Sequence, residues 1–290
     1  MADLNWSDAQ WQKINDAVNE AFGKASVASA FLPMYGPLAG SSETVRNERL
    51  KQKGGTESSP LTISLDKDHA EVNLNLVTVT VNVELSGEQV ADESLSNALL
   101  AFRRAANILA QEEDRIVFEG SDGTKATTLT KTVGPQKGLA DPTMKFELLG
   151  AEQGTELGRD LVKQIVKAIH KLEDKSNPAP FACVLGNRLF EAAHDPADSL
   201  VLPADRILPL LKGGPLLRCG KMDESKGIVV SLAGNAIDIV VGTPPTVQFL
   251  QRTIDAKFVF RVYERFALRI RDKENLPVAG FKLPEGGKKG

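Results

Sequence analysis

Apolar and polar residues alternate along residues 71–85, with one change of phase at Val77. Alternation with a period of two is typical of a β-strand that buries one face. The change of phase predicts that the two halves bury opposite faces, through a bulge or a move between packing surfaces. At about 3.3 Å per residue the stretch would extend for roughly 50 Å, far beyond the usual strand of about 5–6 residues.

A second alternating stretch, at Leu61, Ile63 and Leu65, precedes the first across a polar turn. Together the two stretches predict a β-ribbon over residues 61–85. A ribbon with little core beneath it needs a packing surface on another chain, so the pattern indicates a protein built to assemble. The ribbon residues expected at contacts between subunits are Val77, Val79, Val81 and Val83.

Helical spacing predicts an amphipathic helix over residues 7–24, with Ser7 as its N-cap. One stripe of this helix carries Trp11, Ile14, Val18 and Phe22. The simplest interpretation is that the stripe belongs to the core of the subunit. A groove beside it that admits a partner peptide would instead make it a docking site.

A second helix is predicted over residues 94–118, about twice the usual length. Near its C-terminal end stand Glu112, Glu113 and Asp114, whose charge has the wrong sign for the negative end of the helix dipole. These acids should either pair with cations elsewhere, at a contact between subunits, or face water. Exposure to water is the favoured interpretation.

From residue 155 onward the pattern alternates between helix and strand. It predicts helices at 157–172, 188–194 and 205–211, a buried strand at 181–185, a hairpin joining 227–232 to 236–241, and a long strand at 258–270. These elements indicate an α+β subunit. A compact mixed domain occupies about residues 150–255, and a discontinuous elongated domain is made from the rest.

Composition excludes several classes of protein. The 290 residues are 42% hydrophobic with a formal net charge of −3, so no global basic field draws the chain to nucleic acid. No apolar run approaches the ~18 residues that span a bilayer, and the N-terminus lacks a secretory pattern, so we expect a cytoplasmic protein without a membrane partner.

One face of the long strand at 258–270 is nevertheless basic. Solvation of this face, or pairing with acids such as those at 112–114, explains it better than specific nucleic-acid binding does, because no exposed aromatic residues interleave with the cations. The cations are Lys257, Arg261, Arg265, Arg269 and Arg271.

Motifs for catalysis are missing from the sequence. Cys183 lies inside an apolar strand, where an inert buried thiol is the better interpretation, and Cys219 is equally well explained as structural. The spacing of the three histidines fits no metal-ligand or nucleophile motif. We therefore expect a protein that is not an enzyme and that holds no metal or other cofactor.

Taken in order, several segments resemble the encapsulins, the bacterial and archaeal nanocompartment shell proteins of the linocin type. The resemblance covers roughly residues 6–283. The segments that carry it are WSDAQWQKINDAVNEAF, FLPMYGPLAG, QEEDRIVFEG, NPAPFACVLGNRLFEAAH, GGPLLRC, GIVVSLAGNAIDIVVG and FVFRVYERFALRI.

The resemblance implies the fold of tailed-phage capsid proteins of the Hong Kong 97 type, with an extended loop, a peripheral domain and an axial domain. It implies the following bounds: an N-terminal helix and link at 1–40, the extended loop at 41–90, a peripheral domain with a spine helix at 91–150 and 256–283, an axial domain at 151–255, and a flexible tail at 284–290.

In function, the resemblance implies a self-assembling icosahedral shell that encloses cargo enzymes, such as ferritin-like proteins or dye-decolorising peroxidases. The expected docking patch for cargo targeting peptides is Trp11, Ile14, Val18, Phe22 and Phe31. The expected pore loop contains His194, Asp195 and Asp198, and a ring of its acids would favour cations. Some relatives hold a flavin at a tryptophan near the ribbon. The tryptophans here are Trp6 and Trp11, so no flavin is expected.

Two other functions are alternatives to the shell. A phage major capsid protein shares the fold but usually carries a scaffold, often as an N-terminal extension of about a hundred residues, whereas the first helix here begins near Ser7. A hydrolase or peptidase would need a nucleophile with a neighbouring base, and no such pair is recognisable.

Overall fold

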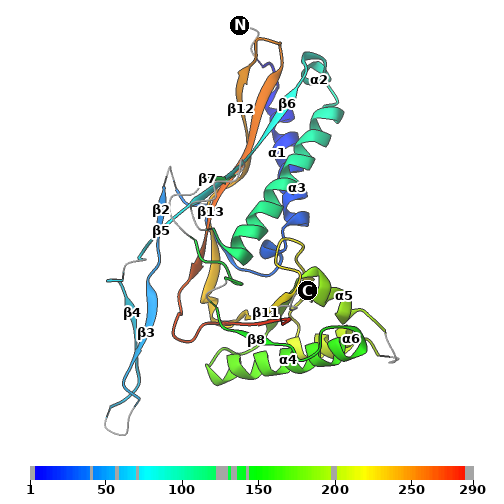
Figure 1. Ribbon diagram of the computed structural model, residues 1–290. Helices are drawn as coiled ribbons and strands as arrows, with labels where there is room; N and C mark the ends of the chain where they lie inside the picture. Colours follow the sequence, from blue (N-terminus) through cyan, green and yellow to red (C-terminus); the bar gives the residue numbers. More distant parts are fainter. Residues whose placement is uncertain are drawn as a thin grey trace, which may run out of the picture.

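The subunit, described here from a computed structural model, has an elongated arm, a second lobe and a projecting hairpin (Figure 1). The structure describes residues 4–39, 42–55, 59–69, 72–121, 130–131, 136–141, 144–196 and 201–284. Helices and sheets are mixed in both parts of the molecule, which makes it an α+β protein.

Two helices form one layer of the arm. Helix α1 (Asp8–Ala25) begins at a capping box, in which the Gln10 N–H donates to Ser7 Oγ at 3.3 Å and the Ser7 N–H donates to Gln10 Oε1 at 2.9 Å. Helix α3 (Ser96–Glu119) runs beside it (Figure 1). Both helices confirm the elements predicted from apolar periodicity.

The sheet of the arm has the order β1-β12-β13-β6-β7, with β1 parallel to β12 and the other pairs antiparallel. Helix α3 packs on β6 and β13, and α1 packs on α3 and β12. The strands are β1 (Met34–Tyr35), β6 (Val77–Leu85), β7 (Thr130–Lys131), β12 (Ile237–Arg252) and β13 (Phe258–Ile270).

Aromatic rings fill the space between these two layers. The Trp6 ring stacks on Phe260 of β13 with centroids 4.9 Å apart, and Phe102 of α3 meets Phe260 edge-on at 5.4 Å. The Trp6 indole N–H donates to the Val90 carbonyl at 2.9 Å, so burial leaves its polar atom satisfied. This cluster ties the start of the chain to the end of the arm.

The second lobe contains a sheet of order β10-β9-β11-β14-β8, on which α4 packs (Figure 1). Its strands are β8 (Phe146–Leu148), β9 (Phe181–Leu185), β10 (Leu216–Arg218), β11 (Lys226–Ser231) and β14 (Val278–Lys282). Its helices are α4 (Gly154–Asp174), α5 (Asn187–Ala193) and α6 (Pro203–Ile207), the last continued by a 3-10 turn at Leu208–Leu211. The predicted helices and the strand at 181–185 are confirmed.

The hairpin that projects from the body is formed by β3 (Arg49–Lys53) and β4 (Thr62–Asp66), paired antiparallel (Figure 1). At its root, β2 (Thr44–Arg46) pairs with β5 (Asn73–Asn75). A short helix, α2 (Gly87–Ala91), follows β6 at the far end of the arm.

The change of phase at Val77 marks a change of packing surface, as predicted. Leu76 packs with Val240 and Ala267 on one side of the sheet. From Val77 onward the apolar residues of β6 belong to the core beneath the helices. The predicted single ribbon over 61–85 is wrong, however, because β6 is an interior strand of the arm and only the β3–β4 hairpin projects among the described residues.

The predicted hairpin between 227–232 and 236–241 is also wrong. Strand β11 lies in the second lobe between β9 and β14, whereas β12 lies in the arm beside β13. Strand β9 pairs with one edge of β11 and β14 with the other, so no edge is left for β12. The turn at Ala233–Asn235 therefore carries the chain from one lobe to the other.

These pairings also place two strands outside the expected domain bounds. Residues 237–252, expected in the axial domain, form β12 of the arm, and β14, expected in the peripheral domain, belongs to the sheet of the second lobe. Of the expected tail at 284–290, residues 285–290 lie outside the described residues.

Replacing Phe102 with Ala should lower the free energy of unfolding by about 3–5 kcal/mol, because a fully buried ring leaves a cavity between helix and sheet. Urea unfolding followed by the fluorescence of Trp6 and Trp11 measures the change. The matched control is Leu100→Ala on the same helix, where the side chain is 69% exposed and the change should stay within about 0.5 kcal/mol. Equal effects of the two substitutions would contradict this packing.

Candidate assembly, docking and pore surfaces

The projecting hairpin exposes a row of large apolar side chains. Leu61, Ile63 and Leu65 are 57%, 62% and 54% exposed, and they alternate from the residue before β4 along that strand. In the register of the hairpin, Ile63 lies opposite Gln52 and Leu65 opposite Leu50. A two-stranded ribbon offers no core to cover such a row, and contiguous apolar surface of this kind marks an interaction site. The row is therefore the strongest candidate for a contact between subunits.

The valines expected at that contact lie elsewhere. Val77, Val79, Val81 and Val83 are all buried inside their own subunit, in the core beneath the helices. Strand β6 pairs with β13 along its whole length, and on its other edge Thr78 and Val79 pair with β7. Placing these valines at a contact between subunits is wrong. The alternation of apolar and polar residues indicates that one face of the strand is buried, but it does not indicate which chain covers that face.

The expected docking stripe on α1 divides into two groups. Ile14, Val18 and Phe22 are buried in the arm, which confirms the interpretation of the stripe as core. Trp11 and Phe31 are half-buried and keep part of their surface exposed. Trp11 packs edge-on against Trp6 with centroids 5.2 Å apart, and Phe31 stacks on Phe118 of α3 at 6.3 Å.

A polar groove of about 650 Å³ lies between α1 and α3, and the sequence did not single it out. Arg103 and Arg104 contribute to its α3 side, and Glu20 and Lys24, paired at 2.6 Å, to its α1 side. The only signal in the sequence was the polar spacing opposite the apolar stripes, which ordinarily indicates a solvated face. Its cations exceed its acids, so the groove is electropositive in an otherwise acidic chain.

The three acids near the end of α3 are buried, against the expectation that they face water. Asp114 accepts from the backbone N–H groups of Val27 and Ala28 at 2.9 and 2.8 Å, and so satisfies the start of the 3-10 turn at Ala28–Ala30. Ser26 Oγ donates to Glu113 Oε2 at 2.8 Å. Placing Glu113 and Asp114 at contacts between subunits is therefore wrong, because both acids join α3 to the chain after α1 within one subunit.

Glu112 is held differently from its neighbours. It forms a bidentate ion pair with Arg115, with its oxygens 2.8 and 3.0 Å from the guanidinium nitrogens. Its side chain is buried, so this acid too lies inside the subunit rather than in water.

Burial shifts the acidity of the two deeper carboxyls. Removal from water raises the pKa of Glu113 to about 8, although the hydrogen bond from Ser26 opposes the shift. Burial likewise raises the pKa of Asp114 to about 6, and its backbone hydrogen bonds hold it below that of Glu113. Glu264 of β13 faces them, and its pKa is raised well above the ordinary value by burial and by these two acids.

Part of the expected pore loop follows α5. His194 and Asp195 are exposed at the end of this helix, and Asp198 lies outside the described residues. The His194 ring packs on Phe190 with centroids 4.3 Å apart, and its Nδ1 lies 2.9 Å from the Phe190 carbonyl oxygen. The described part of the loop thus presents polar side chains at the surface of the second lobe.

Two basic side chains at β13 form ion pairs with acids of their own subunit. Arg269 pairs with Asp238 of β12, with Nε 2.8 Å from Oδ1, and its guanidinium lies 4.7 Å from the centre of the Tyr35 ring. Lys257, just before the strand, pairs with Glu84 at 3.3 Å. Pairing with acids is confirmed for these two cations, but their partners are not the acids of α3.

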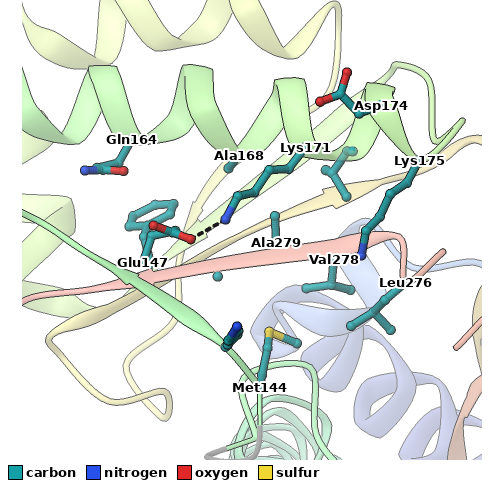
Figure 2. Close-up of a pocket in the computed structure, with 14 residues that line it drawn as sticks. Met144, Glu147, Gln164, Ala168, Lys171, Asp174, Lys175, Leu276, Val278 and Ala279 are labelled. Atoms are coloured by element: carbon teal, nitrogen blue, oxygen red, sulfur yellow. Dashed lines mark hydrogen bonds and ion pairs between the residues drawn. The ribbon is translucent and has the colours of Figure 1, made fainter. Parts of the chain in front are cut away.

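A cavity of about 390 Å³ opens between α4, β8 and β14 (Figure 2). Lys171 of α4 forms an ion pair with Glu147 of β8 across it, and Leu276 and Val278 contribute apolar surface. Within the described ranges, no group of three or more histidine, cysteine, aspartate or glutamate side chains is placed to hold a metal ion. No helix among those residues is long and apolar enough to cross a membrane.

Both cysteines are buried free thiols, as expected for structural residues. Burial raises the pKa of Cys219 to about 11 and that of Cys183 further still. A nucleophilic thiol needs a shift in the opposite direction.

Comparison with solved structures defines the class of fold. The crystal structure of a virus-like particle from Pyrococcus furiosus matches with a TM-score of 0.66 at 15% identity, over 94% of this chain and 99% of that chain. The capsid of Myoviridae phage XM1 matches with a TM-score of 0.56 at 16% identity, over 87% of this chain and 90% of that chain. The subunit therefore has the α+β fold of Hong Kong 97 type capsid proteins, as the sequence resemblance implied.

Sequence comparison then gives the family. The family model Linocin_M18, described as "encapsulating protein for peroxidase", matches residues 2–267, so the chain belongs to this family of encapsulin shell proteins. The type 1 encapsulin shell protein EncA of Myxococcus xanthus (strain DK1622) is 23% identical over 279 residues, which cover 91% of this chain and 90% of the relative. The protein is a structural shell protein that assembles with copies of itself.

Replacing Asp114 with Ala should lower the free energy of unfolding by about 1–3 kcal/mol, because two backbone N–H groups lose their acceptor in a buried place. The measurement is urea unfolding at pH 7. Asp16→Ala is the control, because Asp16 is exposed on α1 and accepts from the exposed side chain of Gln12, so its loss should be nearly neutral. A stability of Asp114→Ala equal to that of the control would show that Asp114 does not hold the turn.

Proposed function

We propose that the chain closes into an icosahedral shell in the cytoplasm, that the shell encloses cargo proteins, and that the shell itself is not an enzyme. The single observation that carries assembly is the β3–β4 hairpin, which projects from the body with an apolar row exposed (Figure 1). A two-stranded ribbon with an exposed apolar row is stabilised when a neighbouring copy covers that row. A closed point group then ends growth without leaving ribbons uncovered.

Cargo docking is proposed on the helix layer of the arm. The exposed parts of Trp11 and Phe31 supply apolar contact, while Ile14, Val18 and Phe22 support them from the core. The electropositive groove between α1 and α3 lies along the same layer and offers polar contacts to a peptide. A peroxidase is the first cargo to test, because the family is described as encapsulating one. A ferritin-like protein is the other cargo class expected.

Passage through the shell is proposed at the loop after α5. Copies of this loop brought together around a symmetry axis would place Asp195 of each subunit near the opening. A ring of carboxylates attracts cations and repels anions. Small cations would therefore enter more readily than anions of the same size.

A phage major capsid protein is the second candidate, since it has the same fold. Membership of the encapsulin family favours the compartment. Purified particles separate the two functions, because a compartment contains protein and a phage capsid packages DNA.

Replacing Ile63 and Leu65 together with Ser should reduce particle yield at least ten-fold while leaving the subunit folded, because both side chains are already exposed in the monomer. Size-exclusion chromatography and negative-stain electron microscopy measure assembly, and circular dichroism measures folding. Ser64→Ala on the same strand is the control and should assemble normally. Full assembly of the double variant would remove the hairpin from the contact between subunits.

Trp11→Ser and Phe31→Ser should each lower the amount of cargo per particle several-fold without preventing assembly, because each removes half-exposed apolar surface from the helix layer. Cargo is measured as its mass ratio to shell protein in particles purified from cells that produce both. Met34→Ser, at an exposed residue of β1, is the control. Unchanged cargo in intact particles of both variants would place docking elsewhere.

A further inference from the structure

We propose that Arg265 and Arg269 of β13 form a clamp, which fixes the direction in which the β3–β4 hairpin leaves the arm and thereby selects one particle size. The clamp rests on the proposed function, in which the hairpin makes the contact between subunits. The observation that carries it is that both arginines donate to backbone carbonyls of the chain that leads into the hairpin.

Residues 42–46 lead from the arm into the hairpin and include β2. Arg265 Nη2 donates to the Ser42 carbonyl at 2.9 Å, and Arg269 Nη1 donates to the Arg46 carbonyl at 3.2 Å. Hydrogen bonds from a charged donor are stronger than those between neutral groups. The two arginines therefore hold this segment at both of its ends, against one strand of the arm.

An apolar contact lies between these two hydrogen bonds. Side chains alternate along a strand, so Ala267 lies on the same face of β13 as the two arginines. Val45 of β2 packs against the cluster that contains Ala267 and Leu76. Gly242 of β12 leaves room for this cluster, because a Cβ there would lie only 2.4 Å from Leu76 Cδ1. Apolar packing thus supplements the hydrogen bonds in holding β2.

Arg269 is itself held firmly. Its Nε and Nη2 donate to the two carboxylate oxygens of Asp238 on β12 at 2.8 and 2.5 Å, and both side chains are buried. Its guanidinium also lies 4.7 Å from the centre of the Tyr35 ring. A bidentate pair fixes the plane of a guanidinium, so Nη1 points to the Arg46 carbonyl from a fixed position. The hairpin is therefore positioned by the sheet of the arm.

Two further hydrogen bonds attach the first strand of the hairpin to the residues that follow β13. The Leu50 N–H donates to the Arg271 carbonyl at 2.8 Å, and the Gln52 N–H donates to Glu274 Oε2 at 3.3 Å. The attachment thus runs from the chain before β2 into β3, and it is made throughout by β13 and the residues after it.

A hairpin of fixed direction gives every subunit the same contact geometry with its neighbour. Repetition of one contact geometry closes an assembly of one size, because closure depends on the rotation between neighbours. A hairpin that is free to swing would allow several rotations. The clamp therefore makes one closed size the outcome of assembly.

Arg265→Met tests the clamp, because it keeps a long apolar side chain and removes the donor to Ser42. In hydrogen exchange of assembled particles, the amides of residues 43–50 should exchange about five-fold faster, as expected for the loss of one hydrogen bond. Electron microscopy and native mass spectrometry should show more than one particle size, where the wild type has one. Arg265→Lys keeps a cationic donor and should restore both properties.

Lys257→Met is the matched control, because it removes the same charge at the same strand but its partner is Glu84 and not the hairpin. This control should keep the wild-type exchange and particle size. The variant Arg269→Met/Asp238→Leu removes the buried pair as a unit, so no unpaired charge is left behind. It should broaden the particle sizes further, and Arg265→Met still decides the question if this variant fails to fold.

Uniform particles of wild-type size from Arg265→Met would overturn the clamp, and so would a wild type of mixed sizes. The variant with Ile63 and Leu65 replaced by Ser separates this failure from that of the proposed function. Loss of its particles, beside uniform Arg265→Met particles, overturns the clamp alone. Normal assembly of the serine variant overturns the hairpin contact, and with it any effect of the clamp on particle size.

Discussion

The packing of α3 against β6 and β13 is the contact on which the rest of the subunit depends. It buries the alternating valines of β6, the aromatic cluster around Phe102 and Phe260, and the acids at the end of α3. Close packing between one helix and two strands makes the arm a single body. The hairpin and the second lobe are thus attached to an arm that keeps its shape.

A rigid arm also explains how polar residues are tolerated in its core. Glu113 and Asp114 accept hydrogen bonds from the Ser26 hydroxyl and from the Val27 N–H group, which the turn after α1 would otherwise leave unpaired. Glu264 is less well satisfied, and the packing around it leaves it almost no contact with water. The incompletely hydrogen-bonded carboxyl group of Glu264 lowers the stability of the arm, while the apolar side chains around it stay closely packed.

Local periodicity in the sequence was enough to predict α1, α3, β9 and β13, because each buries one face or its whole length. Pairing between distant strands was not predictable in this way. Val77–Leu85 has the same alternation whether a helix of its own subunit or another chain covers it, and β11 followed by β12 looks like a hairpin until the other partner of each strand is known.

The candidate site was predicted less well than the fold, and for a related reason. The interpretation of Ile14, Val18 and Phe22 as core is correct, but the alternation predicts the contact residues of the ribbon at the valines of β6, whereas the exposed row is Leu61, Ile63 and Leu65. The burial of Glu113 and Asp114 had no local signal, since their partners at 26–28 lie far away in the chain. The family resemblance supplied the fold and the shell function, which the residues alone did not reach.

The order of strands in the arm has a consequence for synthesis. The β3–β4 hairpin is complete within the first quarter of the chain, whereas β6 waits for β13, which lies near the end. Contacts of such long sequence separation form late. During translation the β3–β4 hairpin, with its exposed apolar row, therefore leaves the ribosome well before β13 completes the arm. The first contacts between neighbouring nascent chains are thus contacts between their hairpins. Timing during translation, and any chaperone that covers the ribbon in that interval, thus influences how many chains reach a closed particle.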